Sequence, residues 1–191
     1  MKKNFLTAIW FTLVTTILLG VIYPLAVTGI SQVFFRDRAN GQLLETNGKI
    51  TGSRIIGQAF TGPSYFHSRP SAAGTGYDPT SSGGSYLGPT NKALVDRVNG
   101  DVQSLRAENP SMPVPIDLVT TSGSGLDPHI SPAAAEFQIP RIARERHISE
   151  TDLRALVSRH TDGRQFGFLG EARVNVLELN LELDVSHPAA R

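Results

Sequence analysis

The most constraining feature of this sequence is an apolar run near its start that contains no charged residue from Asn4 to Phe35. Ile, Leu, Val, Phe and Thr dominate the run, and only Lys2 and Lys3 carry charge before it. A helix crosses the hydrocarbon core of a bilayer with about 20 apolar residues, at a rise of about 1.5 Å each. The run therefore predicts an N-terminal membrane anchor over residues 1–35, with a single transmembrane helix at about 7–30.

The composition of the span leaves open whether it also docks on other helices. The predicted span includes Ile9, Trp10, Phe11, Leu13, Val14, Ile17, Leu18, Leu19, Gly20, Val21 and Ile22. Thr12 and Thr16 lie among these residues, and hydroxyl side chains hydrogen-bond between membrane helices that approach closely. Threonine is also simply tolerated in lipid, which is the alternative interpretation. Pro24 lacks a backbone N–H and predicts a kink or an end of the regular helix.

The run is longer than the apolar region of an ordinary signal peptide, which favours an anchor that is not cleaved. Val27 and Gly29 are small enough to imitate a cleavage site after Gly29, and cleavage there would release a secreted binding domain that begins at Ile30. The short tail with Lys2 and Lys3 predicts a cytoplasmic N-terminus, because positive residues favour the cytoplasm. Residues from about Arg36 onward are then expected outside the cytoplasm, on the far side of an inner (plasma) membrane.

The remaining segment, residues 36–191, is long enough for one domain with its own core. All but two of the 18 Lys and Arg residues and all 17 Asp and Glu residues lie in it, so its net charge is close to zero. It has no basic stripe of the kind that nucleic-acid-binding proteins carry. The sequence contains no cysteine, which excludes disulfides, thiolate metal sites and cysteine nucleophiles.

Local patterns predict both strands and helices in this domain. Asn47-Gly48 favours a tight turn between two short strands, one around Leu43-Leu44 and one over Arg54–Gln58. Residues 91–108 have the spacing of an amphipathic helix, which Thr90 can cap. Pro115–Val119 is typical of a buried strand.

The C-terminal third is predicted to be mainly helical. Ser131 with Pro132 begins a helix that Pro140 is expected to interrupt. Ser149 with Asp152 resembles a capping box that opens a further helix to His160. Residues 174–185 alternate Leu and Val with polar residues, which is the period of a strand, but Leu and Glu are also good helix formers. Both structures stay open for this segment.

Residues 61–90 are mostly Gly, Pro and Ser, yet they also contain Tyr65, Phe66, Tyr77 and Tyr86. A flexible linker is polar and poor in aromatic residues. We therefore expect an ordered, irregular loop, and long loops of this kind are often functional. A surface loop that packs only on its own domain is the alternative.

No complete catalytic motif is present. Ser122 or Ser124 can be the nucleophile of a hydrolase, with His67, Asp127 or His129 as partners, but Ser122 occupies the position where a nucleophile elbow needs glycine. The five histidines have no metal-ligand spacing. The Gly83-Gly84 segment has no Walker lysine and no Rossmann setting.

Several long blocks resemble the C subunit of the bacterial potassium-transporting P-type ATPase, the KdpC family of the Kdp complex. The blocks are Gly52–Gln58, Tyr65–Ala72, Ser82–Asn91, Ser122–Ser131, Gln138–Arg141 and Gly170–Leu183. They occur in the order of that family and cover nearly the whole chain together with the N-terminal span. One position departs, because the family pattern usually has asparagine where this chain has Tyr86.

The resemblance implies an accessory, non-catalytic subunit of a four-part potassium pump. The implied partners are a potassium-channel-like subunit, the P-type ATPase catalytic subunit and a small single-span subunit. The family is commonly described as ATP-binding, and it is said to raise the pump's affinity for nucleotide. Because ATP is cytoplasmic and this domain is predicted across the bilayer, such an effect would be an indirect coupling. ATP would be held by the catalytic subunit, and potassium would act through the complex.

Together these observations predict an α+β protein with one N-terminal transmembrane helix followed by a single mixed α/β extracytoplasmic domain, residues 36–191. The expected contacts are the lipid bilayer and the partner subunits. The candidate partner-contact residues are Thr12, Thr16, Tyr65, Phe66, His67, Arg69, Tyr77, Tyr86, Asn91, Ser124, Asp127 and His129. An anchored extracytoplasmic hydrolase that uses Ser122 or Ser124 is the alternative function.

Overall fold

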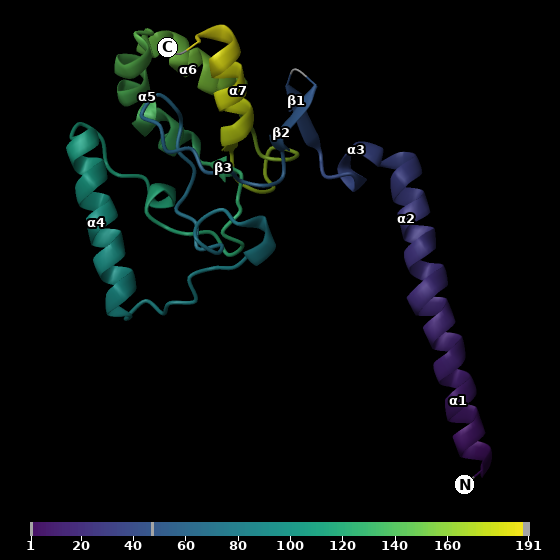
Figure 1. The fold of residues 1–191 in the computed structure, drawn as a ribbon. Helices are drawn as coiled ribbons and strands as arrows, with labels where there is room; N and C mark the ends of the chain where they lie inside the picture. Colours follow the sequence, from purple (N-terminus) through teal and green to yellow (C-terminus); the bar gives the residue numbers. More distant parts are fainter. Residues whose placement is uncertain (1, 47, 189–191) are drawn as a thin grey trace. The chain divides into compact units, whose positions relative to one another are not determined.

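The computed structural model of the chain describes residues 2–46 and 48–188, which divide into two compact units at Leu43 (Figure 1). The first unit is helical and contains the apolar run. The second unit, from Leu44 onward, mixes helices with short strands. The predicted α+β class with one N-terminal apolar helix is confirmed.

The first unit is a long helix followed by one short helix. It comprises α1 (Lys2–Ile17), a π-helical turn (Leu18–Ile22), α2 (Tyr23–Phe34) and α3 (Arg36–Ala39). Lys2–Phe34 is long and apolar enough to cross a membrane, and none of the residues in its apolar window is buried. Pro24 lies in the first turn of α2, directly after the π-helical turn, where a missing N–H costs little. The regular α-helix is interrupted there, as Pro24 predicts.

The second unit contains two small sheets and four longer helices. Its elements are β1 (Leu43–Thr46), β2 (Lys49–Ser53), α4 (Lys92–Glu108), β3 (His129–Ile130), α5 (Pro132–Arg146), α6 (Glu150–Arg159), β4 (Thr161–Asp162), β5 (Arg173–Asn175) and α7 (Val176–Ser186), with 3-10 turns at Pro79–Ser81 and Ile116–Leu118. β1 pairs with β2. β5 lies between β3 and β4 and is antiparallel to both, so that Val174 is opposite Ile130 on one side and Thr161 on the other.

The hydrophobic core lies where α5, α6 and α7 meet the three-stranded sheet (Figure 1). Its fully buried large apolar side chains are Phe66, Phe137, Ile139, Ile142, Leu153, Leu156, Leu179, Leu183, Val174 and Val176. Most come from helices that capping side chains delimit as the sequence predicts. The Ser131 hydroxyl accepts from Ala134 N at the start of α5, and the Ser149 hydroxyl accepts from Asp152 N at the start of α6.

The long irregular loop before α4 is attached to this core by buried polar side chains. Asn180 of α7 accepts from Phe66 N and donates to Phe66 O, both at 2.9 Å. Gln138 of α5 does the same for His67, accepting from its N–H at 2.7 Å and donating to its carbonyl at 3.1 Å. These two amide side chains satisfy the backbone as a neighbouring strand would, which lets a non-strand segment be buried.

Two arginines complete the attachment of the same loop. Arg141 donates to the carbonyl oxygens of Pro63 and Tyr65 and pairs with Glu108 at 2.9 Å. The fully buried Arg146 side chain donates to Ser64 O, pairs with Asp184 at 2.7 Å and lies 4.7 Å from the centre of the Tyr65 ring. Residues 63–67 are therefore an ordered part of the domain, as predicted for an aromatic loop.

The alternation in the C-terminal tail does not form a strand. Only β5 is extended, and Val176–Ser186 is the helix α7, capped by the Asn175 side chain. Its buried residues Val176, Leu179, Asn180 and Leu183 have the i, i+3, i+4, i+7 spacing of a helix. Asn180 is polar, so it fits a solvent-facing position in the alternating pattern of a strand, although it is buried in α7.

Four smaller expectations were wrong. Pro115–Val119 contains a 3-10 turn at Ile116–Leu118 instead of a strand. α5 continues through Pro140, because the buried side chains on both sides of it outweigh the lost hydrogen bond. Asn91, whose side chain accepts from Ala93 N, caps α4 in place of Thr90. The second hairpin strand is Lys49–Ser53, earlier than Arg54–Gln58, and Asn47 of the predicted turn lies outside the described residues.

Substitution of Asn180 tests whether the loop depends on these amide contacts. Asn180→Ala should lower the free energy of unfolding by about 2–4 kcal/mol, because two buried backbone groups of Phe66 lose their partners. Urea unfolding of the detergent-solubilised chain, followed by circular dichroism, measures this. Asn99→Ala, at an exposed position of α4, is the matched control and should change stability by less than about 0.5 kcal/mol. Equal effects of the two substitutions would contradict the attachment.

Candidate functional site

Three irregular segments meet beside β3 to form the candidate site: Ile56–Gln58, Arg69–Gly84 and Thr120–His129. Gly57 N donates to Leu126 O at 2.8 Å, and Gly83 N donates to Ser124 O at 2.9 Å. The Ser71 hydroxyl donates to Gly125 O at 2.6 Å and also accepts from Tyr77 N at 2.8 Å. We call these three segments the loop cluster. Four of the six resemblance blocks of the sequence thus contribute to one place in the domain.

Gly125 is a position where two segments of the loop cluster approach closely. Its φ of +67° lies in the left-handed region that only glycine adopts readily. A Cβ atom there would lie 2.6 Å from Gly83 O and 2.7 Å from Ala73 N. The glycine at position 125 of the Ser-Gly-Ser-Gly sequence is therefore explained by backbone packing between two loops.

Arg69 is the central side chain of the loop cluster. Its guanidinium donates to Thr120 O, Thr121 O and the Thr120 hydroxyl, each at 3.3 Å. It also pairs with Asp127 at 3.3 Å. A planar guanidinium can hold several acceptors at fixed angles, so Arg69 connects the two longer segments.

Asp127 is shared between Arg69 and His129. Its Oδ1 accepts from His129 N at 3.0 Å and lies 3.4 Å from His129 Nδ1. Burial by itself raises the pKa of Asp127, but the hydrogen bonds from the His129 side chain and backbone, together with the charges of His129 and Arg69, outweigh it. The pKa of Asp127 therefore lies below its ordinary value, and the group is a carboxylate at neutral pH.

Arg69, Asp127 and His129 line a hollow of about 600 Å³ at the surface. The other lining residues are Ile116, Asp117, Thr120, Ile130, Ser131, Glu171, Ala172 and Arg173. Asp117 is held in place because its carboxylate accepts from both the backbone N and the hydroxyl of Ser131, at 2.7 and 3.1 Å. Ile116 is 74% exposed at the edge. We call this surface the Arg69 hollow.

The aromatic residues of the predicted site have different surroundings. Phe66 is fully buried in the core, and the Tyr65 hydroxyl donates to Asp184 at 3.1 Å. The Tyr77 hydroxyl donates to Arg69 O, and burial raises the pKa of Tyr77. Tyr86, in contrast, is 89% exposed. Among the aromatic candidates, Tyr86 thus has the most surface to offer a partner.

His67 is held inside the same loop. Its Nε2 donates to Gly62 O at 2.9 Å. Burial, the largest influence, lowers the pKa of His67 below its ordinary value. The ring is therefore neutral at pH 7 and stabilises the loop without a charge.

The remaining predicted contact residues do not join the Arg69 hollow. Asn91 caps α4, and Thr12 and Thr16 lie in the separate helical unit. Sequence reasoning missed Asn180, Gln138, Arg141, Arg146 and Asp117. Gln138 and Arg141 could have been noticed as polar residues among the apolar positions of a predicted helix, which signals buried polar contacts.

The serines of the hydrolase alternative have structural partners. The Ser124 hydroxyl accepts from Leu126 N at 3.1 Å and lies 3.5 Å from the Ser122 hydroxyl. These are the contacts of a turn in which hydroxyls satisfy nearby backbone groups. The hydrolase interpretation is not supported. In the described parts of the chain, no group of three or more His, Asp or Glu residues is placed to hold a metal ion.

Comparison with known proteins gives matches along nearly the whole chain. A family model described as KdpC: K+-transporting ATPase, c chain, matches residues 5–185. The chain is 65% identical over 188 residues to the potassium-transporting ATPase KdpC subunit of Koribacter versatilis (strain Ellin345), with 98% of this chain and 97% of that protein covered. It is 57% identical over 182 residues to the KdpC subunit of Methylobacterium nodulans (strain LMG 21967 / CNCM I-2342 / ORS 2060), with 88% and 90% covered. The KdpC subunit of Caulobacter vibrioides (strain NA1000 / CB15N) is 53% identical over 174 residues, with 91% and 88% covered.

The two nearby glycines of the Ser-Gly-Ser-Gly turn provide a matched test of the loop cluster. Gly125→Ala should destabilise the domain by about 2 kcal/mol or more, since alanine is strained in the left-handed conformation and its Cβ would clash with Gly83 O. Gly123→Ala should be close to neutral, because nothing lies within 4 Å of its Cβ position. Urea unfolding of both variants distinguishes the positions, and a neutral Gly125→Ala would refute the close packing.

Proposed function

Because the chain belongs to the KdpC family of K+-transporting ATPase c chains, we propose that it is an accessory, non-catalytic subunit of an ATP-driven potassium pump. Its apolar helix would hold it in the bilayer, and its folded domain would contact the other subunits. The observation that carries this proposal is the match of the whole chain, from residue 5 to 185, including both the apolar helix and the domain.

The arrangement of the chain supports a membrane-held partner protein. Lys2–Phe34 is apolar and without buried residues in its central window, which suits lipid or neighbouring helices on all sides. The polar groups of the loop cluster bond mainly to one another, as Arg69, Asp127 and His129 illustrate. Such a surface is preformed and rigid, which favours protein recognition because little ordering is required on binding.

The finer features of the function are part of the same proposal. We propose that the subunit lies in the inner membrane, with Lys2 and Lys3 in the cytoplasm and residues 36–191 outside the cytoplasm. Its partners are the potassium-channel-like subunit, the P-type catalytic subunit and the small single-span subunit. ATP is held by the catalytic subunit, so any influence of this chain on nucleotide affinity is an indirect coupling across the membrane.

We assign partner contact in the domain to the Arg69 hollow and the neighbouring exposed residues. The hollow combines apolar side chains at Ile116 and Ile130 with fixed charged groups at Arg69 and Asp127. Interfaces commonly pair an apolar anchor with oriented polar groups of this kind. Tyr86 and Ser124 extend the surface along the loop cluster.

The proposed topology can be tested because the natural sequence has no cysteine. A single Tyr86→Cys substitution, at an exposed position, should react with a membrane-impermeant maleimide in intact cells. A single Lys3→Cys substitution should react only after the membrane is opened. Mass-tag shifts on a gel measure both, and labelling in the reverse order would refute the orientation.

The proposed function can be tested by co-purification from mild detergent. The unaltered chain should bring the other pump subunits with it, and Ile116→Asp should reduce their yield several-fold, because a charge would then face the apolar part of the interface. Val185→Asp is the matched control, since Val185 is 76% exposed on α7 and outside the hollow. Both variants should keep the stability of the unaltered domain.

Two outcomes would count against this assignment. If no pump subunit accompanies the unaltered chain, the accessory-subunit proposal fails. If the subunits accompany both variants equally well, the proposal of a pump subunit stands and the assignment of contact to the Arg69 hollow is wrong.

A further inference from the structure

The connection between β4 and β5 ends in a tight loop with two exposed phenylalanines. Phe166 is 87% exposed and Phe168 is 71% exposed, and Leu169 follows them. We call residues 165–169 the aromatic tip. Leaving two such apolar side chains in water is unfavourable, and an exposed apolar pair of this kind is typical of an interaction site.

Four of the five backbone N–H groups of the aromatic tip donate within the turn. Gln165 N donates to Leu169 O and Leu169 N donates to Gln165 O, both at 2.9 Å. Gly167 N donates to Arg164 O at 3.1 Å, and Phe168 N donates to Gln165 O at 3.2 Å. Because unpaired backbone groups are costly in an apolar medium, these internal bonds favour entry of the tip into one.

The charged residues at the base of the tip also pair with each other. Arg164 pairs with Glu171 at 2.7 Å, and Arg173 pairs with Asp162 at 3.5 Å. The apex therefore presents apolar atoms, while the charged residues pair on the segments that lead to it. This ordering, apolar apex and charged base, matches the change from acyl chains to headgroups at a bilayer surface.

The aromatic tip begins near the point where the chain that follows the apolar helix enters the domain. Arg54 O accepts from Asn175 Nδ2 at 2.8 Å, and the Arg54 side chain pairs with Glu178 at 2.5 Å. Asn175 ends β5, and the neighbouring strand β4 leads into the tip. Arg54 and Asp162, the last residue of β4, line one small hollow of about 270 Å³, so the end of β4 and the segment that enters the domain share one side of it.

Chain length limits how far this side of the domain can be from the bilayer. The apolar helix ends at Phe34, and β1 begins at Leu43. The intervening residues, four of them helical, reach about 20 Å at most. Because β1 and β2 form a hairpin, the chain returns close to Leu43 before it joins the domain. A connection of this length is short enough to let the aromatic tip reach a lipid surface.

We propose that the aromatic tip inserts Phe166 and Phe168 into the headgroup and acyl boundary of the bilayer. The tip would be a second membrane contact that fixes the tilt of the domain, in addition to the apolar helix. Arg164 at its base would lie at the level of the lipid phosphates. The side chains of Ile50 and Ile55, on the segments that lead into the domain, are exposed as well. The inference rests on the membrane anchoring proposed above.

The natural sequence offers a direct test because Trp10 is its only tryptophan. The full chain is reconstituted into phosphatidylcholine liposomes that contain a nitroxide-labelled lipid. Three proteins are compared: the unaltered chain, the Trp10→Phe, Phe168→Trp chain and the Trp10→Phe, Val185→Trp chain. Nitroxide lipid quenches tryptophan in contact with lipid, and aqueous iodide quenches tryptophan in contact with water.

The proposal expects lipid quenching of the Phe168→Trp chain to be several-fold stronger than that of the Val185→Trp chain, with the opposite order for iodide. Equal iodide quenching of the two chains, with Trp10 still quenched by lipid, overturns the proposal and leaves the anchor intact. Protection from iodide that arises only after the other pump subunits are added assigns the tip to a protein contact and also overturns it. Loss of lipid quenching at Trp10 overturns the anchoring itself, and with it this inference.

Discussion

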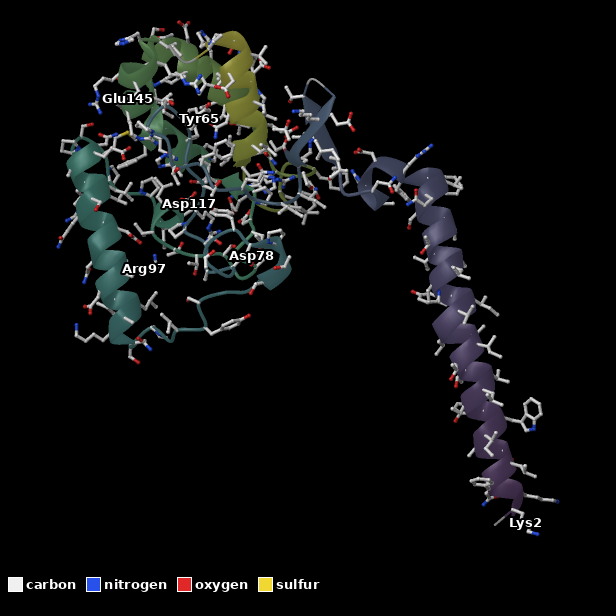
Figure 2. All side chains as sticks on the ribbon, viewed as in Figure 1. Lys2, Tyr65, Asp78, Arg97, Asp117 and Glu145 are labelled. Atoms are coloured by element: carbon white, nitrogen blue, oxygen red, sulfur yellow. The ribbon has the colours of Figure 1, made fainter. Side chains whose placement is uncertain are left out.

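The fold of the domain depends on side-chain amides that hydrogen-bond to the backbone of a buried loop, where a neighbouring strand would otherwise do so. Residues 63–67 cross the core without belonging to either sheet, so their backbone N–H and C=O groups need partners that no ladder supplies. Asn180 and Gln138 provide them in pairs for Phe66 and His67, and Arg141 and Arg146 bond to the carbonyl oxygens just before (Figure 2, where Tyr65 is labelled). Buried polar groups are costly unless they are fully satisfied, so this arrangement specifies one path for the loop.

That path determines the candidate site. Once Phe66 is fixed in the core, Arg69 follows three residues later and reaches Thr120, Thr121 and Asp127. The loop then turns back at Tyr77, whose backbone bonds to Ser71, and runs past the Ser-Gly-Ser-Gly turn at Gly125. The geometry of the Arg69 hollow is thus an extension of the core contacts of α5 and α7, although none of the helix residues that hold the loop lines the hollow.

The sequence predicts those features whose cause is local. Ser131 and Ser149 signal helix starts because capping involves neighbouring residues. The apolar run signals the long helix because its composition alone makes it suited to cross a bilayer. Asn180 shows where local reasoning fails. Its amide bonds to a residue 114 positions earlier in the chain, so its burial cannot be seen in the pattern around it, and α7 then resembles a strand. Arg69, Asp127 and His129 are named from the sequence, but their convergence with Asp117 and Glu171–Arg173 in the Arg69 hollow is missed for the same reason, since these residues come from three segments far apart in the sequence.

The same contacts explain why a chain with so many Arg, Asp and His side chains serves better as a partner than as a catalyst. A catalytic group needs an unsatisfied hydrogen-bonding capacity directed at substrate, whereas Asp127 is bonded to Arg69 and His129, and Asp117 to Ser131. Satisfied polar groups make the surface rigid and keep its charges in fixed positions. Rigidity lowers the entropic cost of association, so a partner subunit that meets this surface can be bound with little reorganisation. In the proposed pump, a domain joined by about eight residues to an apolar helix in the bilayer would meet its partner subunits at high effective concentration, so that modest contacts would suffice for assembly.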